Sequence, residues 1–312
     1  RFMERYAPSI KDLAPRDMVS RAIATEISAG NGAGPDSDYV YLDLTHLGAE
    51  TIKKKLPDIT DFVRTYVKIE PIEEPIPVQP TAHYAMGGIP TDVHSRVLSD
   101  EKGTVLPGVY AAGEAACVSV HGANRLGTNS LLDIVVFGKR AGQSMVDYVT
   151  QTKPNTISDS ASDDLSKKIQ NLIDKEHTDE FSVANIRKDL QESMEENAKI
   201  FRTKETLEKQ TEILEELRER YENVTIFDKS KVHNSELVEA IELDYLLDMS
   251  EATVASALAR NESRGAHSRQ DFPDRDDTNF MKHSFAFKKD NTANLKYKDV
   301  ELGKYEPMER KY

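Results

Sequence analysis

Two basic residues that lie close to glycines are the side chains of this sequence best suited to chemistry. His83 stands in TAHYAMGGI (residues 81–89), and Arg125 stands in HGANRLGTNS (residues 121–130). Glycine lets a ligand approach the main chain, a guanidinium can pair with a carboxylate through two hydrogen bonds, and an imidazole adds another donor. Either residue alone is better explained by a structural role. The two segments together predict a site for a small dianion.

The composition is that of a globular chain that does not bind nucleic acid. The chain has 312 residues, 38% hydrophobic and 30% charged, and this length predicts two or three structural units. The net charge of -13 would repel a phosphate backbone. No apolar run reaches the ~20 residues that span a bilayer, so no direct membrane insertion is expected. The single cysteine, Cys117, excludes an internal disulfide and fits a reducing compartment.

Residues 1–75 are predicted to mix helices with strands. A helix is expected to begin at Pro15, because apolar residues recur at helical spacing after it and proline suits a helix start. Residues 39–44 (YVYLDL) are predicted to form a strand, and residues 49–66 are predicted to form short helices. Prolines at four positions in residues 69–80 predict an extended crossing between units.

Residues 81–150 are predicted to carry the site. Residues 108–114 (GVYAAGE) are interpreted as a short buried strand that ends in a tight turn. Residues 130–148 are interpreted as a mostly apolar helix, which is typical of the interior of a large protein. A polar linker over residues 150–164 closes this part.

Two other patterns do not predict sites. The segment GNGAG (residues 30–34) resembles a nucleotide-binding loop, but it follows a helix and precedes none, so phosphate binding is not expected. The histidines lack metal-ligand spacing, so no metal site is predicted.

Residues 165–262 are predicted to form an antiparallel helical bundle. Three amphipathic stripes joined by short connections support this prediction, and the charge runs between them are interpreted as solvated faces. The stripes are Ile186, Leu190, Met194 and Phe201; Leu207, Leu214, Leu217 and Tyr221; and Leu237, Ala240, Ile241, Leu247 and Val254.

Arginine and aspartate alternate densely in residues 262–277 (ESRGAHSRQDFPDRDD). On an open surface these charges would contribute little to stability, because single exposed ion pairs are weak. The segment is interpreted as a polar network against another unit or a charged ligand, and an interdomain ion network explains it equally well. The tail that follows is expected to form a terminal hairpin or an extended arm.

Four segments resemble the succinate dehydrogenase/fumarate reductase flavoprotein family, and in particular the succinate dehydrogenase flavoprotein subunit. The resemblance covers nearly the whole chain except the final arm. The family is about twice this long, so the chain is identified as its C-terminal half. The N-terminal half, with the Gly-rich dinucleotide-binding turn and the histidine bonded covalently to FAD, is expected to be absent from this chain. The four segments are RFMERYAP (1–8), PTAHYAMGGIPT (80–91), HGANRLGTNSLLD (121–133) and ESRGAH (262–267).

The resemblance implies an α/β plus α fold in four parts. Residues 1–77 would be the remainder of a capping (substrate) domain, and residues 78–150 the C-terminal part of a Rossmann-like FAD-binding domain with the substrate site. Residues 151–262 would be the antiparallel helical bundle, and residues 263–312 the Arg/Asp-rich segment with a short C-terminal arm.

The resemblance also implies a role for each matching site residue. His83 and Arg125 fall where the family binds its dicarboxylate, and Arg16 falls where it has a proton-shuttling arginine. A guanidinium is an unusual base because it normally stays protonated, and only burial among other cations would let it act. Without the family, Arg16 is interpreted as a helix-start residue paired with Asp17 or Asp12. The positions that match FAD contacts are Glu114, Ser130 and Leu131, the last two at a helix N-terminus.

The implied activity is that of succinate dehydrogenase, respiratory complex II of the tricarboxylic acid cycle and electron transport. Succinate would lose a hydride to FAD while Arg16 removes a proton, and electrons would pass to an iron–sulfur subunit and quinone. The implied partners are the iron–sulfur subunit and membrane anchor subunits. The implied location is peripheral on the inner membrane, facing the bacterial cytoplasm or the mitochondrial matrix.

Three alternatives remain beside this interpretation. Fumarate reductase uses the same residues in the opposite direction, and L-aspartate oxidase resembles this family too. The chain could also be a catalytically silent fragment, because it lacks the cofactor turn. By itself it is expected neither to hold FAD tightly nor to be active.

Overall fold

The structure is a computed structural model whose described part divides into two compact units. The first unit contains residues 1–83 with 307 and 308, and the second contains residues 84–306. The described residues are 1–153, 156–158, 160–289, 292–304 and 306–308.

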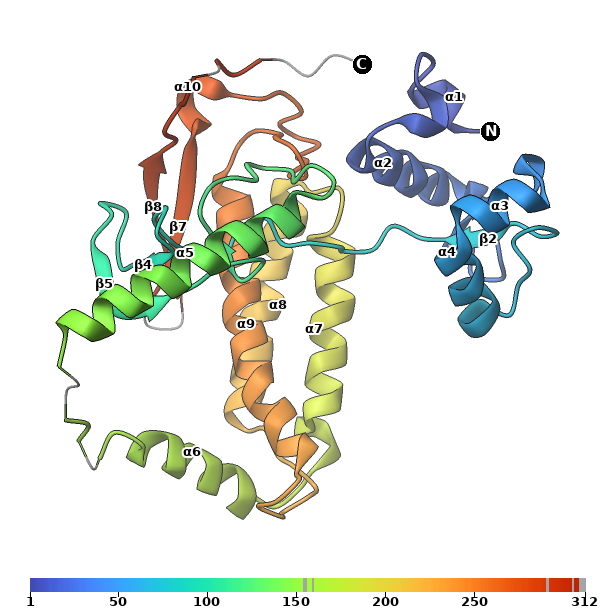
Figure 1. The fold of residues 1–312 in the computed structure, drawn as a ribbon. Helices are drawn as coiled ribbons and strands as arrows, with labels where there is room; N and C mark the ends of the chain where they lie inside the picture. Colours follow the sequence, from blue (N-terminus) through green and yellow to red (C-terminus); the bar gives the residue numbers. More distant parts are fainter. Residues whose placement is uncertain (154–155, 159, 290–291, 305, 309–312) are drawn as a thin grey trace. The chain divides into compact units, whose positions relative to one another are not determined.

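Helices and a small antiparallel sheet make up the first unit (Figure 1). The predicted helix begins directly after Pro15, whose φ of -57° is already helical. The predicted strand and short helices are also confirmed, and the glycine-rich segment 30–34 leads toward a strand rather than a helix. The elements are α1 (Met3–Tyr6), η1 (Lys11–Leu13), α2 (Arg16–Glu26), η2 (Ile27–Asn31), β1 (Val40–Leu42), η3 (Thr45–Leu47), α3 (Ala49–Lys55), α4 (Pro57–Phe62), η4 (Val63–Val67) and β2 (Ile76–Val78).

The helices α1 and α2 share a small core with a buried carboxylate at its edge. Glu26 accepts hydrogen bonds from Arg5 Nη2 and the Tyr6 hydroxyl, both at 2.6 Å, and from Asn31 Nδ2 at 3.0 Å. These bonds, that from Arg5 above all, hold the pKa of Glu26 below its usual value. The buried apolar residues of this core are Met3, Ala7, Ala14 and Ala22.

Short strands open the second unit. β3 (Ile89–Pro90) pairs in parallel with β6 (Ala116–Cys117), and β4 (Arg96–Leu98) pairs antiparallel with β5 (Val105–Tyr110). β5 confirms a strand near residues 108–114, and the turn after it is confirmed at Gly113. The prediction that this strand is buried is wrong, because its residues are half-buried or exposed. The helix that packs on β5 leaves the central residues of the strand exposed.

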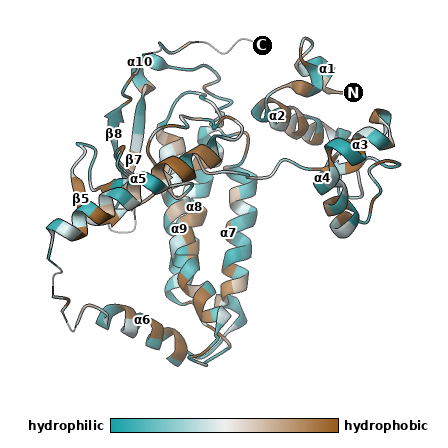
Figure 2. Cartoon of the chain, viewed as in Figure 1, coloured by the Kyte–Doolittle hydropathy of each residue, from teal (hydrophilic) through white to brown (hydrophobic). Residues whose placement is uncertain are grey.

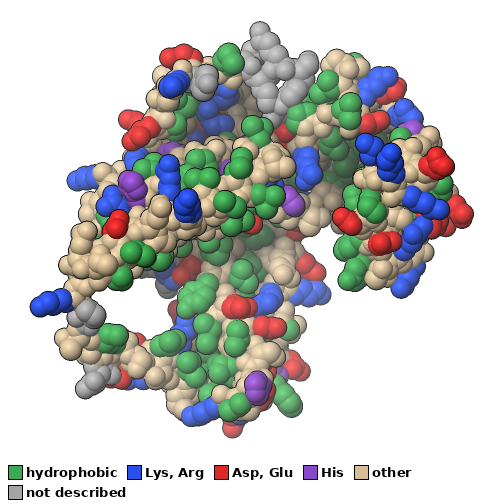
Figure 3. All heavy atoms as spheres, viewed as in Figure 1, with side chains coloured by type: hydrophobic (Ala, Val, Ile, Leu, Met, Phe, Trp, Pro, Cys, Tyr) green, Lys and Arg blue, Asp and Glu red, His purple; other side chains and the backbone are tan. Residues whose placement is uncertain are grey.

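That helix, α5 (Asn129–Gln151), confirms the helix predicted at 130–148 but not its burial. Leu131, Leu132 and Val135 are 61 to 69% exposed. Figure 2 shows the hydrophobic colour on the amino-terminal half of α5, and Figure 3 shows hydrophobic side chains at the surface along it. An apolar sequence predicts contact but does not say which element supplies it, and the described second unit covers little of this helix. Residues 154–155 and 159 of the predicted linker lie outside the described residues.

The helical bundle predicted at 165–262 is confirmed, with neighbouring helices antiparallel (Figure 1). Ser182, directly before α7 (Val183–Asn197), forms a bridge with Thr225, just after α8 (Lys204–Glu222). Arg202, which precedes α8, forms a bridge with Arg269, which follows α9 (Ser235–Ala259). The elements are α6 (Asp163–Asp174), η5 (Asp179–Phe181), α7 (Val183–Asn197), α8 (Lys204–Glu222) and α9 (Ser235–Ala259).

The main hydrophobic core lies inside this bundle. All three predicted stripes contribute to it, and Ile186, Leu207 and Leu247 are completely buried. Phe201 is the exception, since it lies in the loop between α7 and α8 and is half-buried. Asn234 caps α9 by accepting from the Leu237 N–H at 2.8 Å.

The tail forms the hairpin that was one of its two expected forms. α10 (Asp277–Phe280) is followed by β7 (Lys282–Lys289) and β8 (Thr292–Asp299), which pair antiparallel and pack against α9. The described fold is therefore mixed α/β with a helical part. Within the described ranges, no helix has both the length and the apolarity that a membrane span requires.

Candidate functional site

Arg125 lies in the loop between β6 and α5 and rests on an aromatic ring. Its guanidinium carbon is 4.5 Å from the centroid of the Tyr84 ring, which is a cation–π contact. Nη1 donates to the Leu126 carbonyl oxygen at 3.2 Å, whereas Nε is buried and has no partner among the described residues. Buried donors in proteins are normally paired. An anionic ligand would supply the missing acceptor.

A buried histidine–aspartate pair contacts the other end of Tyr84. His121 Nε2 lies 3.0 Å from Asp133 Oδ2 and 3.3 Å from the Tyr84 hydroxyl. The side chains of His121 and Asp133 are only 10% and 3% exposed. Burial raises the pKa of Tyr84 above its usual value, and the negative charges of Asp133 and Glu114 act in the same direction. The Tyr84 phenol therefore keeps its proton at neutral pH.

Glu114 follows the turn after β5. Its Oε1 accepts from the Ala85 N–H at 3.0 Å, and its Oε2 has no partner among the described residues. Gly113 in that turn has a φ of 78°, which favours glycine. Gly88 is also required, because a Cβ there would lie 2.5 Å from the Ala115 carbonyl oxygen. The two glycines allow the Ala85 and Glu114 segments to approach closely.

A turn from the end of the bundle supports the Arg125 loop. The Ala266 N–H donates to the Ala123 carbonyl oxygen at 3.0 Å. Gly265 has a φ of 60°, and a Cβ on it would lie 2.5 Å from the same oxygen. Only glycine lets this turn come so close, so the ESRGAH segment helps to shape the loop that carries Arg125.

Residues 262–277 form an ion network within the second unit. Glu262 is completely buried, and its carboxylate accepts from Arg260 Nη1 at 2.7 Å and from Arg264 Nε and Nη2 at 2.9 Å. Arg269 is 1% exposed and pairs through Nε and Nη2 with Asp271 at 2.8 and 2.7 Å. The structure therefore shows an ion network among residues of this segment and the end of α9, whereas a contact with another unit or a charged ligand stays a prediction. The network ties the chain after α9 back onto the end of that helix.

His267 is held neutral among arginines in this network. Its Nδ1 lies 3.0 Å from Arg202 Nη1, and its Nε2 lies 3.2 Å from the Arg260 carbonyl oxygen. Since Arg202 can only donate, the arrangement assigns the imidazole proton to Nε2. Burial lowers the pKa of His267 to about 4, and the positive charges of Arg202, Arg260 and Arg269 add to this effect. Burial also lowers the pKa of Arg202.

The structure brings only part of the predicted site together. Arg125 and Glu114 lie in the second unit with Tyr84, whereas Arg16 and His83 belong to the first unit. Arg16 is the first residue of α2 and is exposed, and His83 is exposed as well. Within the described part of the chain Arg16 forms no ion pair with Asp12 or Asp17, and Asp17 instead pairs with Arg21 at 2.8 Å.

Three residues of the Arg125 cluster were not selected from the sequence. Tyr84, His121 and Asp133 all lie inside the segments that carry the family resemblance. A tyrosine directly after His83 and a histidine four residues before Arg125 were the available signals. Their proximity, however, depends on the packing of α5 against the preceding strands and could not be read from spacing.

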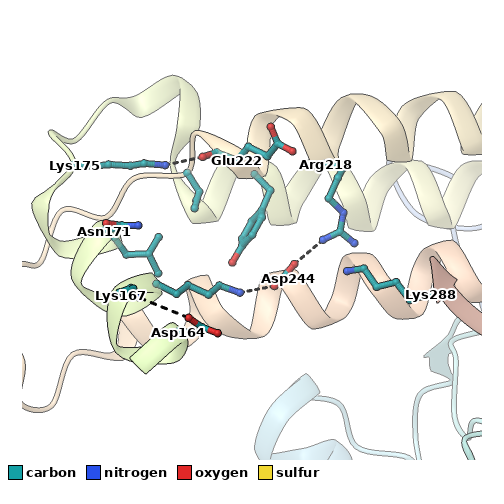
Figure 4. Close-up of a pocket in the computed structure, with 12 residues that line it drawn as sticks. Asp164, Lys167, Asn171, Lys175, Arg218, Glu222, Asp244 and Lys288 are labelled. Atoms are coloured by element: carbon teal, nitrogen blue, oxygen red, sulfur yellow. Dashed lines mark hydrogen bonds and ion pairs between the residues drawn. The ribbon is translucent and has the colours of Figure 1, made fainter. Parts of the chain in front are cut away.

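A separate cavity of about 550 Å³ lies between α6, α8 and α9, and most of its charged side chains are already paired (Figure 4). Lys168 Nζ contacts Asp244 Oδ2 at 2.5 Å, and Lys288 Nζ contacts Asp248 at 2.5 Å. Arg218 donates to Asp244 and Asp248 at 2.6 Å. Because these cations bind carboxylates of α9, the lining is best explained as a network that joins the bundle helices and β7.

Two family models match the sequence. The model described as "FAD binding domain" matches residues 1–131, and the model described as "Fumarate reductase flavoprotein C-term" matches residues 187–312. The first match confirms the expectation that FAD is the cofactor.

Individual proteins match over nearly the whole chain. The succinate dehydrogenase flavoprotein subunit of Rickettsia bellii is 47% identical over 291 residues, which cover 92% of this chain and 48% of that protein. The fumarate reductase flavoprotein subunit of a Serratia species is 42% identical over 307 residues, 96% of this chain and 50% of that protein. A solved Escherichia coli quinol fumarate reductase matches with a TM-score of 0.87 at 37% identity, over 99% of this chain and 54% of that one. The chain spans about half the length of the curated relatives it matches.

The second unit has features that fit a flavin nucleotide. Thr128 makes no side-chain cap on α5. The Asn129 and Leu131 N–H groups donate to the Leu126 and Thr128 carbonyl oxygens, so the Ser130 N–H is the group at this helix start that can face an electron-rich or anionic atom. Leu131 is 65% exposed and offers an apolar surface to a planar ring. Glu114 Oε2 can accept a hydrogen bond from a hydroxyl group. This donor and acceptor set suits FAD.

Proposed function

Because the chain belongs to the succinate dehydrogenase/fumarate reductase flavoprotein family, we propose that it takes part in the FAD-dependent interconversion of succinate and fumarate. The observation that carries the proposal is the Arg125 guanidinium, which is stacked on Tyr84 and has a buried, unpartnered Nε among the described residues. A fixed guanidinium with a free donor is suited to a carboxylate.

In this proposal each predicted polar residue has one task. Arg125 pairs with a substrate carboxylate and fixes the orientation of the substrate carbon chain. His83 is the second dicarboxylate-binding residue, and Arg16 transfers the proton at the carbon next to the one that exchanges hydride. The family resemblance supports the roles of His83 and Arg16.

FAD, when bound, supplies the acceptor or donor of the hydride. We propose that Glu114, Ser130 and Leu131 hold it. Glu114 would accept from a hydroxyl, the Ser130 N–H would face an electron-rich atom, and Leu131 would contact the ring. The uncapped start of α5 and the free Oε2 of Glu114 support these assignments.

The wider setting follows from the same proposal. Electrons would be exchanged with an iron–sulfur subunit and, through membrane anchor subunits, with a quinone. The protein would lie peripherally on the inner membrane, facing the bacterial cytoplasm or the mitochondrial matrix. Residues 1–77 would then belong to a capping domain, 78–150 to the FAD-binding domain, 151–262 to the bundle, and 263–312 to the Arg/Asp-rich segment and arm.

Substitution of Arg125 tests the proposal. In the intact flavin-containing protein, Arg125→Ala should weaken the affinity for malonate, a dicarboxylate inhibitor, by at least about tenfold, because charged hydrogen bonds are lost. The flavin absorbance should remain. Arg140→Ala is a matched control, since Arg140 also stacks on an aromatic ring, Phe137, but lies on the exposed surface of α5. Unchanged malonate affinity in Arg125→Ala would contradict the proposal.

Fumarate reduction is a second candidate for the physiological direction. The match to the Serratia fumarate reductase subunit and the solved quinol fumarate reductase favour it. Rates of succinate oxidation with a dye and of fumarate reduction with a reduced viologen, measured on one preparation, separate the two directions. Turnover of aspartate in the same assay would indicate an aspartate oxidase instead.

A further inference from the structure

Tyr84 touches both Arg125 and the buried pair of His121 and Asp133. We propose that Tyr84, His121 and Asp133 are positioning residues for Arg125. The pair fixes the Tyr84 ring, and the face of that ring holds the guanidinium where a substrate carboxylate can reach it. This inference rests on the proposed carboxylate-binding role of Arg125.

The two contacts of Tyr84 use different parts of its side chain. The Arg125 guanidinium lies over the ring face, 4.5 Å from the centroid, whereas the hydroxyl lies 3.3 Å from His121 Nε2. The His121 ring meets the Tyr84 ring edge to face, with centroids 5.5 Å apart. A hydroxyl anchored at one end leaves the ring little freedom to turn. The face on which Arg125 rests is therefore fixed before any ligand binds.

Asp133 in turn fixes His121. The two side chains are nearly fully buried, and Asp133 Oδ2 lies 3.0 Å from His121 Nε2. A carboxylate at this distance favours a proton on that nitrogen and holds the plane of the imidazole. The same N–H then also points at the Tyr84 hydroxyl oxygen, which accepts it as the longer of the two contacts. Asp133 is on the first turns of α5, whereas His121 lies in the loop that carries Arg125. The pair therefore joins the loop to the helix behind it.

Unsatisfied polar atoms concentrate in this cluster. His121 Nδ1, Asp133 Oδ1 and Arg125 Nε are all buried without a partner among the described residues. Native proteins keep few such atoms, and each one calls for a reason. A pair selected for stability alone would be expected to satisfy its second nitrogen and second oxygen. Three unsatisfied atoms around one aromatic ring indicate that orientation of Arg125, rather than stability, accounts for the arrangement.

Affinity for malonate in the intact flavin-containing protein, measured by calorimetry, tests this inference. Tyr84→Leu removes the ring face and should weaken malonate binding about tenfold, the upper part of the range for a cation–π contact. Tyr84→Phe keeps the ring but loses its anchor, and should weaken binding about threefold. Asp133→Asn should have a similar effect to Tyr84→Phe. The double variant Tyr84→Phe/Asp133→Asn should be no weaker than either single variant, because both changes interrupt the same connection.

Controls separate positioning from general damage. Phe137→Leu removes the other arginine–aromatic stack of this region, with Arg140 at 5.5 Å, and should leave malonate affinity unchanged. Flavin content and thermal midpoint are followed for every variant, and the near-isosteric Tyr84→Phe and Asp133→Asn decide the question if Tyr84→Leu does not fold. Wild-type malonate affinity in both of these, or multiplied effects in the double variant, would overturn the inference. If Arg125→Ala abolishes binding while these variants do not change it, the inference fails and the proposed function stands.

Discussion

Arg125 and Arg269 both stack on aromatic rings, but they use their nitrogen atoms differently. Arg269 lies 5.0 Å from the Phe272 centroid, and its Nε, Nη1 and Nη2 all donate, to Asp271 and to carbonyl oxygens at the end of α9. Arg125 uses Nη1 on one carbonyl oxygen and leaves Nε without a partner among the described residues. A guanidinium with every nitrogen engaged stabilises the fold, whereas one with an unused donor is available to a ligand.

His121 and His267, both largely shielded from solvent, repeat this contrast. Both nitrogens of His267 are engaged, by Arg202 and by a carbonyl oxygen. His121 engages Nε2 but leaves Nδ1 unpartnered within the described part of the chain. The same residue types therefore serve the fold in the Arg/Asp-rich segment and, on our proposal, a ligand near Tyr84.

The largest loss of stability is expected at Arg269, whose guanidinium nitrogens all donate hydrogen bonds. Arg269→Met should lower the free energy of unfolding by about 3 to 5 kcal/mol, because it breaks a buried ion pair and removes the guanidinium donors from Asp271 and from the carbonyl groups at the end of α9. Urea titration monitored by circular dichroism measures this loss. Arg269 also holds the pKa of Asp271 at about 2, so that pKa should rise in the variant. A loss below about 1 kcal/mol would remove the basis of the comparison.

The second prediction is a pH dependence of stability that arises from His267. The pKa of folded His267 is about 4 against an ordinary 6.5, so between these values the unfolded chain binds a proton that the folded chain does not. The stability contributed by neutral His267 is therefore complete above pH 6.5 and decreases by about 3 kcal/mol as the pH falls to 4. His267→Asn can still accept from Arg202 but does not titrate. Urea titrations at several pH values should show a smaller slope for this variant, and equal slopes would contradict the prediction.

A smaller loss of stability is expected at Gly265, which joins the Arg/Asp-rich segment to the loop that carries Arg125. Gly265→Ala places a Cβ 2.5 Å from the Ala123 carbonyl oxygen at a φ of 60°. The strain should cost about 1 to 3 kcal/mol of unfolding free energy and should also weaken malonate binding, because the Arg125 loop must move. Gly142→Ala on α5 is the control, since its Cβ meets open space. Wild-type stability and affinity in Gly265→Ala would show that the turn does not shape the loop.

Local patterns predicted the elements of this fold well. The period of apolar residues located α7, α8 and α9, and proline and glycine marked the start of α2 and the turn after β5. Periodicity is a property of a segment, whereas burial is a property of its neighbours. For this reason the prediction of a helix at α5 was correct, whereas the predictions that α5 and β5 are buried were wrong.

The candidate site was predictable only in part, for a related reason. Glycine-flanked cations drew attention to Arg125, and the family resemblance added Glu114. The link from Asp133 through His121 to Tyr84 joins residues distant in sequence, and only packing reveals it. The support of Ala123 by Gly265 is of the same kind. The roles of Arg16 and His83 stay predictions.

The smallest effect on stability is expected at Arg125 itself. Arg125→Met gives up one exposed hydrogen bond at 3.2 Å and a cation–π contact, and it also removes an unpartnered buried donor. These terms nearly cancel, so the free energy of unfolding should change by less than about 1 kcal/mol in either direction. The same urea titration as for Arg269→Met measures the difference. A loss as large as that of Arg269→Met would make Arg125 a structural residue, whereas unchanged stability with lost malonate binding is the expected result, because a side chain kept for a ligand need not stabilise the fold.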